Sequence, residues 1–441
     1  MEYCIRKINP AVIVLMLMTL ANNISAQESF GNKPAKAYFS ELDSLCLLDN
    51  GKLWGVKLYG PTMFVNDDTR AIIANQTDKA KMLCKQDEVF VGQLPENINT
   101  ANTSFNWKGF DRTMVMWNDI PKNDKYSRDK LLIHENWHRI QKEIGIASVT
   151  SQNSHLDDLQ GSVLIKLELL ALSHAFSETE NSDKIKNLQN AFIIRKYRQL
   201  LFPGNNENEF ERHEGMAEYT GYKLCGLNKY AISKVIRKQL ELSVDKDGFA
   251  NSFAYLTGPA YGFLFDELIP DWIQQIKNGK DMPAIGSGLF VKENIPSDTA
   301  QLKLLISGII SAYNAGQIIK TETEKFEEQK ILISEYKQKF IESDQLIIPN
   351  NNVKFSYNPL EKLIPVEDKG VIYKTMRLTA DWGILEVWNG IFRSNDWQVF
   401  IVPAPKSLDS ENSKEQDYNL MLNNGWKIVK VKDGKFTLKK E

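Results

Sequence analysis

The spacing of apolar and polar residues changes twice along the chain and divides it into three parts. Residues 27–126 hold short apolar runs separated by Asn, Asp, Gly and Pro, as β-strands joined by turns do. Residues 127–345 place apolar side chains three and four positions apart, which is the period of an amphipathic helix. Short alternating runs return over 346–441 and end in a hairpin with Asp433-Gly434 at its turn. The pattern predicts an α+β fold with an N-terminal, largely antiparallel sheet, a helical region and a small C-terminal β domain.

Individual elements can be predicted in each part. Strands are expected over Thr62–Val65, Thr69–Ala74, Glu88–Gly92, Thr113–Trp117, Gly383–Trp388 and Trp397–Val402. Helices are expected over 127–144, 158–178, 183–202, 207–224, 228–243, 259–269 and 301–342. Four tryptophans in the last part are expected to fill a sandwich core, the alternative being a carbohydrate platform: Trp382, Trp388, Trp397 and Trp426.

Residues 1–26 have the layout of a signal peptide. Arg6 and Lys7 precede the apolar stretch 11–21, and Ile24-Ser25-Ala26 gives a tolerable cleavage site before Gln27. The apolar stretch is shorter than the ~17–25 residues that cross a bilayer. We therefore expect an exported protein, periplasmic or extracellular, with no stable membrane insertion once the signal is removed.

Composition restricts the classes of partner. The chain of 441 residues is 42% hydrophobic, enough for two or three domains with real cores. Its formal net charge is −2 and no basic run stands out, so nucleic acid is not expected as a partner. Cys46, Cys84 and Cys225 remain after signal removal, which allows at most one disulfide within the chain, Cys46–Cys84 being the nearest pair in sequence.

One short motif carries chemistry. Residues 134–138 read HENWH, a match to H-E-x-x-H. On a helix His134 and His138 lie on one face, so both imidazoles can reach a zinc ion at ~2.0–2.1 Å. Glu135 would then take a proton from a water activated by the metal. The alternative is an amphipathic helix with two polar-face histidines, but histidine is scarce here, at 5 of 441 residues.

A catalytic zinc site needs a third protein ligand. The stretch 211–221, ERHEGMAEYTG, places Glu214 and Glu218 one helical turn apart, so one can bind metal while the other holds a ligand histidine. A solvated acidic face is the alternative, because three further glutamates precede Glu214. Glu168 is a rival ligand, since a carboxylate in its apolar surroundings is costly unless it binds a metal or a cation.

On these residues the chain resembles the gluzincin metallopeptidases, which pair an H-E-x-x-H helix with a glutamate from a later helix, often within N-E-G-x-A-x-Y. Here residues 213–219 read HEGMAEY, with His213 in place of the usual Asn. Glu214 follows His138 by 76 residues (214 − 138), a longer spacing than in many members. The resemblance covers about residues 110–270 and implies a zincin-like fold with Zn²⁺ as cofactor.

The resemblance also implies a reaction, the hydrolysis of peptide bonds in a peptide or protein substrate with Glu135 as general base. Residues 255–258, YLTG, are similar to the Y-x-x-G of gluzincin aminopeptidases, in which the tyrosine hydroxyl stabilises the oxyanion. Tyr255 takes that role here, with Tyr261 as the alternative donor. The exopeptidase motif G-x-M-E-N is absent before His134, so endopeptidase and exopeptidase action both stay open.

Other predictions concern the surroundings of the motif. His155 either lines the cleft or belongs to a polar cluster that caps the next helix. Thr113–Trp117 would be an edge strand that pairs with extended substrate. Glu168, if it is not a ligand, would pair with Arg195 or Arg198. Two other functions remain possible, an exported zinc protein without catalysis and a zinc hydrolase of non-peptide amides or esters.

Overall fold

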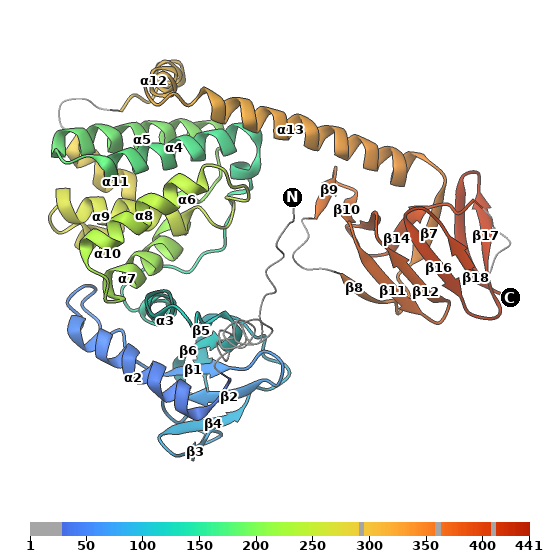
Figure 1. Ribbon diagram of the computed structural model, residues 1–441, viewed down its shortest axis with the longest axis horizontal. Helices are drawn as coiled ribbons and strands as arrows, with labels where there is room; N and C mark the ends of the chain where they lie inside the picture. Colours follow the sequence, from blue (N-terminus) through green and yellow to red (C-terminus); the bar gives the residue numbers. More distant parts are fainter. Residues whose placement is uncertain (1–28, 291–294, 358–362, 407–411) are drawn as a thin grey trace, which may run out of the picture. The chain divides into compact units, whose positions relative to one another are not determined.

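The computed structural model describes residues 29–290, 295–357, 363–406 and 412–441. The chain forms two compact units, Met1–Ile319 and Lys320–Glu441. The first combines a sheet with many helices and the second consists mainly of strands, so the coarse α+β prediction is confirmed (Figure 1). The division falls inside the long helix α13 (Gly316–Lys337), earlier than the boundary expected after residue 345. The predicted signal peptide lies outside the described residues.

The first unit contains a six-stranded sheet in the order β3-β4-β2-β1-β6-β5. Neighbouring strands are antiparallel except for β1 and β6, which pair in parallel from Thr62↔Thr113 to Val65↔Met116. The strands are β1 (Thr62–Val65), β2 (Ala71–Ala74), β3 (Cys84–Gln86), β4 (Val89–Gln93), β5 (Thr103–Trp107) and β6 (Phe110–Met116).

The predicted edge strand Thr113–Trp117 is wrong in its position in the sheet. Thr113–Met116 is the second half of β6, which has β1 on one side and β5 on the other. The strand at the edge is β5, whose polar sequence TSFNW shows no apolar run. Its backbone lies in the sheet because β6 pairs with it along all five residues.

A helix that the strand-like pattern did not predict, α2 (Asn32–Asp49), covers one part of the sheet. Its Phe39 ring stacks on Phe64 of β1 at a centroid distance of 4.4 Å, and Tyr38 stacks near Trp117 at 5.6 Å. The buried positions 35, 38, 39, 42 and 46 follow the helical period, so the signal was present in the sequence.

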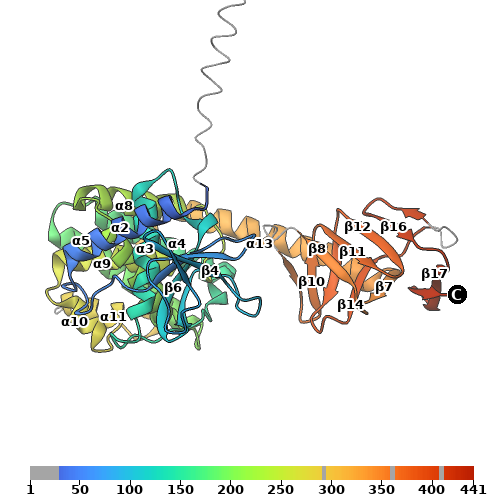
Figure 2. The same cartoon turned by 90° about the horizontal axis from the view of Figure 1, so that it is seen from below.

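The remaining helices of this unit lie beside the sheet (Figure 1, Figure 2). Their apolar side chains form one large core that includes the buried face of α3. By length and composition α4 could cross a membrane, but most of it is buried among these helices. The α-helices that follow α2 in this unit are α3 (Lys125–Ile140), α4 (Leu159–Ser177), α5 (Asn181–Leu201), α6 (Glu207–Phe210), α7 (Met216–Leu224), α8 (Lys229–Ser243), α9 (Ala254–Leu268), α10 (Trp272–Lys277), α11 (Met282–Gly286) and α12 (Thr299–Ala312).

The second unit is a two-sheet sandwich with its core between a seven-stranded and a five-stranded sheet. Trp382 is buried in that core, whereas Trp388 and Trp397 are each 41% exposed, so only part of the predicted tryptophan core is found. The strands are β7 (Gln345–Pro349), β8 (Lys354–Tyr357), β9 (Ile364–Val366), β10 (Gly370–Tyr373), β11 (Met376–Ala380), β12 (Gly383–Val387), β13 (Ile391–Ser394), β14 (Val399–Pro403), β15 (Asn412–Lys414), β16 (Tyr418–Leu422), β17 (Trp426–Lys432) and β18 (Lys435–Lys440).

The three cysteines of the described chain are free thiols. Cys46 and Cys225 are buried and Cys84 is exposed on β3, so the predicted Cys46–Cys84 disulfide is wrong. Burial raises the pKa of the Cys46 thiol to about 12, which leaves it protonated and unreactive.

Candidate metal centre

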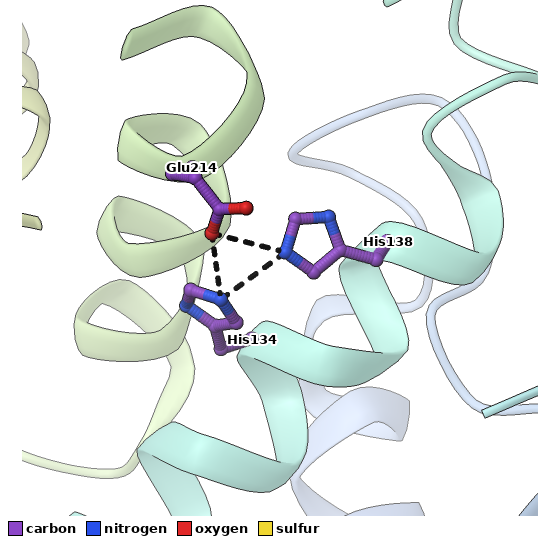
Figure 3. A group of neighbouring side chains, drawn as sticks. All are labelled: His134, His138 and Glu214. Carbon is purple, nitrogen blue, oxygen red and sulfur yellow. Dashed lines mark hydrogen bonds and ion pairs between the residues drawn. The ribbon is translucent and has the colours of Figure 1, made fainter. Parts of the chain in front are cut away.

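Helix α3 presents two histidines to a glutamate from a distant part of the chain (Figure 3). His134 Nε2 and His138 Nε2 lie 3.2 Å apart, and each lies 3.5 Å from Glu214 Oε2. Three ligand atoms about 2.1 Å from a tetrahedral ion would lie about 3.4 Å from one another. The three side chains therefore form a group that could hold a metal ion.

Hydrogen bonds on the far side of each ring decide where the ring protons lie. His134 Nδ1 lies 3.0 Å from Glu218 Oε2, and His138 Nδ1 lies 2.9 Å from Gln141 Oε1. Both oxygens accept, so each Nδ1 carries a hydrogen and Nε2 is the nitrogen of each ring that can bind a metal ion. The two Nε2 atoms converge with an oxygen of Glu214, and three such atoms this close favour a cation between them, either a proton or a metal ion. The residues present thus fit a metal ion.

The pKa shifts of His134 and Glu214 also favour a cation between these side chains. Burial alone would lower the pKa of His134, but hydrogen bonds to Glu214 and Glu218 outweigh it and raise the pKa to about 10. Burial would raise the pKa of Glu214, yet its histidine neighbours hold it well below the usual range. Lys130 Nζ contacts the second oxygen of Glu218 and compensates its charge. The site therefore attracts positive charge, which a proton or a metal ion can supply.

Glu214 stands on a π-helical turn, Glu211–Gly215, inserted between α6 and α7. Such a turn adds a residue to the helical repeat and changes the direction in which neighbouring side chains point. Glu211 is fully buried and binds Arg195, while Glu214 faces the two histidines. The expected helix 207–224 is therefore not one regular α-helix, and the irregularity occurs at Glu214.

The rival ligand Glu168 lies in the core and not at this site. Its carboxylate is fully buried and accepts from Arg195 Nε at 2.9 Å and from Arg198 at 2.6 Å, the pairing expected if it is not a ligand. The hydroxyl of Tyr261, also fully buried, donates to Glu168 at 2.7 Å. This places Tyr261 within the core ion-pair network, away from the role of alternative oxyanion donor.

His155 belongs to the same buried network. Its Nε2 lies 2.7 Å from Glu207 Oε1, and Glu207 in turn binds Arg198. The charge of Arg198 outweighs the effect of burial and lowers the pKa of Glu207, so the Glu207–Arg198 ion pair is charged on both sides. His155 is buried near the start of α4 and does not line the cleft, so it belongs to a polar cluster. The expected cap on α4 is not found, because the N-cap residue, Asp158, makes no capping hydrogen bond through its side chain.

A cleft of about 580 Å³ opens beside His134, His138 and Glu214. Glu135 lines it and is only 7% exposed; burial raises the pKa of its carboxyl group. None of the described side chains donates a hydrogen bond to this carboxylate, so it is available as a base. The lining residues are Asn102, Thr103, Ser104, His134, Glu135, His138, Ser148, Val149, Thr150, His213, Glu214 and Tyr255.

Tyr255 lies at the wall of this cleft and is 36% exposed. Its ring stacks on His134 with a centroid distance of 5.6 Å and an interplanar angle of 6°. Its hydroxyl donates to Glu214 Oε2 at 2.7 Å. Burial and the Glu214 charge raise the pKa of Tyr255, so the hydroxyl stays protonated and remains a donor.

Two glycines bring α9, and with it Tyr255, against the π-helical turn. A Cβ on Gly258 would lie 2.3 Å from Gly215 Cα, and one on Gly221 would lie 2.8 Å from the carbonyl oxygen of Lys130 on α3. Gly221 therefore allows α7 to approach α3, and Gly215 allows the close contact with α9.

Gly258→Ala should move α9 away from the turn and disturb Glu214, because the new methyl group meets backbone that cannot swing aside. We expect about 1–3 kcal/mol of lost stability in a denaturant titration and weaker metal retention. Gly308→Ala in α12 is the matched control, since its Cβ meets nothing within 4 Å. An unchanged Gly258 variant would show that the close approach is not needed.

Two polar residues of the site were not singled out in the sequence, Lys130 and Gln141. They lie four residues before His134 and three after His138 on the same helix, so helical spacing from the motif could have found them. Searches against protein-family models, curated proteins and solved structures find no match to the chain.

Proposed function

We propose that the protein is a zinc-dependent peptidase with a zincin-like first unit. The observation that carries the proposal is the convergence of His134, His138 and Glu214 beside a cleft that also holds Glu135. Two imidazole nitrogens and one carboxylate oxygen form a donor set typical of catalytic zinc. The cleft beside them leaves room for water and substrate.

Zinc, when bound, supplies a Lewis acid and lowers the pKa of a water toward about 7. Glu135 takes the proton of that water and delivers it to the leaving amine. Its raised pKa suits a group that must both accept and donate a proton. The Tyr255 hydroxyl donates a hydrogen bond to the developing oxyanion, which requires it to leave Glu214.

The open edge of β5 beside the cleft favours an extended peptide as substrate. Asn102, Thr103 and Ser104 line it where β5 begins, and β5 has no partner on its outer side among the described strands. An extended peptide can add to such an edge through main-chain hydrogen bonds. The described lining residues include no Lys or Arg to bind a terminal carboxylate, which argues against a carboxypeptidase. The predicted export signal supports an activity in the periplasm or outside the cell.

Incubation with a mixed peptide library, read by mass spectrometry, tests the proposal. We expect internal cuts that disappear with a chelator and return with zinc. Trimmed ends would indicate an exopeptidase. No cuts by a zinc-loaded protein would contradict the proposal and favour a zinc-binding protein without peptidase activity or a hydrolase of other amides or esters.

Tyr255→Phe should lower kcat by about 10²–10³-fold with little change in KM, because it removes one donor to the oxyanion. Tyr261→Phe is the matched control, since that hydroxyl donates to Glu168 in the core. It should reduce stability and leave the kcat of the folded enzyme near the wild-type value. The opposite pattern would show that the wrong ring has been assigned.

A further inference from the structure

A chain of hydrogen bonds connects two of the metal ligands on the side away from the metal position. His138 Nδ1 lies 2.9 Å from Gln141 Oε1, and Gln141 Nε2 lies 2.7 Å from His213 Nδ1. His213 Nε2 then lies 3.0 Å from Glu214 Oε1, the oxygen that does not face the ligand nitrogens. We infer that Gln141 and His213 are positioning residues that fix the tautomer of His138 and the orientation of Glu214.

One backbone carbonyl decides which groups donate and which accept along this chain of hydrogen bonds. Gln141 Nε2 also donates to Ala147 O at 2.9 Å. A carbonyl can only accept, so the amide must turn its NH₂ group toward Ala147 and its oxygen toward His138. Gln141 is 1% exposed, and water cannot substitute for these partners.

This orientation determines the tautomers of two histidines. The amide oxygen accepts from His138, which therefore carries its hydrogen on Nδ1 and keeps Nε2 bare for a metal. The second amide hydrogen points at His213 Nδ1, which must be bare, so the His213 hydrogen is on Nε2 and is donated to Glu214. A single buried glutamine thus sets the tautomers of both His138 and His213.

The same chain of hydrogen bonds gives a role to the histidine at position 213. With its Nε2 hydrogen, His213 occupies Glu214 Oε1 and leaves Oε2 as the oxygen that faces the two ligand nitrogens. Its ring lies against His138 with a centroid distance of 4.8 Å and is part of the cleft wall. His213 is therefore expected to make Glu214 a ligand through one oxygen only. The effect on metal binding rests on the proposed zinc site.

The experiment combines zinc affinity with a direct view of the tautomers. Gln141→Met keeps the side-chain volume and should weaken zinc binding by about 10–100-fold, as loss of an outer partner does. His213→Leu should also weaken it, and the double variant should lose less than the product of the two single effects, because both break one chain. Gln345→Met removes another buried glutamine, in the second unit, and should leave zinc affinity unchanged.

Long-range ¹H–¹⁵N spectra of the metal-free wild-type protein show the tautomers independently of zinc, and the chain has only five histidines to assign. We expect neutral His213 to carry its hydrogen on Nε2 and to switch or mix tautomers in Gln141→Met. A hydrogen on Nδ1 of His213 in the wild type would overturn the inference. So would zinc binding by wild type and Gln141→Met with equal affinity, whereas a wild-type protein that binds no zinc would overturn the proposed function instead.

Discussion

Glu135→Gln is expected to abolish most hydrolysis while leaving zinc bound. The substitution keeps the size of the side chain but removes its ability to take a proton, and loss of a general base lowers rates by about 10²–10⁴-fold. Glu135 is not among the three residues whose ligand atoms converge, so the metal content should stay near one ion per chain. Peptide cleavage and metal content should be measured on the same preparation.

The control for this variant is Glu143→Gln, which neutralises an exposed glutamate shortly after α3. It should match the wild type in both measurements. A zinc-loaded Glu135→Gln variant with full activity would rule out the proposed base, and loss of zinc would place Glu135 among the ligands.

Glu214→Ala is expected to lose zinc on dialysis at micromolar free metal, and with it all activity. It removes one of three ligand atoms, so the loss of affinity should exceed the about 10–100-fold seen when an outer partner is removed. Glu168→Ala is the comparison, because Glu168 was the rival ligand. It should keep most of its zinc but lose about 3–5 kcal/mol of stability, since the guanidinium groups of Arg195 and Arg198 lose a buried partner.

Metal analysis and thermal unfolding of both variants separate the two roles. The reverse result, zinc kept by Glu214→Ala and lost by Glu168→Ala, would move the ligand to α4. Zinc lost by both variants with equal loss of stability would mean that metal binding and the core network cannot be separated.

The parts of the site that follow from helical period could be predicted from the sequence. His134 and His138 share a face because they are four residues apart, and Glu214 and Glu218 both reach His134 for the same reason. The pairing of Glu168 with Arg195 and Arg198 also followed, because a carboxylate in an apolar run needs a cation.

The parts that depend on tertiary contacts could not be predicted. No sequence pattern predicts the π-helical turn at Glu211–Gly215. The turn occurs where Arg195 binds the Glu211 carboxylate and where Gly215 contacts Gly258. The edge position of β5 depends on the parallel pairing of β1 with β6, which joins strands distant in sequence. Whether Tyr255 or Tyr261 faces the cleft depends on how α9 is rotated, and its apolar sequence is buried on most sides.

Anomalous diffraction at the zinc absorption edge, from crystals grown with one equivalent of zinc, tests the central claim most directly. The account predicts one strong peak about 2.0–2.2 Å from His134 Nε2, His138 Nε2 and one oxygen of Glu214. A peak elsewhere in the chain, or no peak between these three side chains in zinc-loaded crystals, would contradict it.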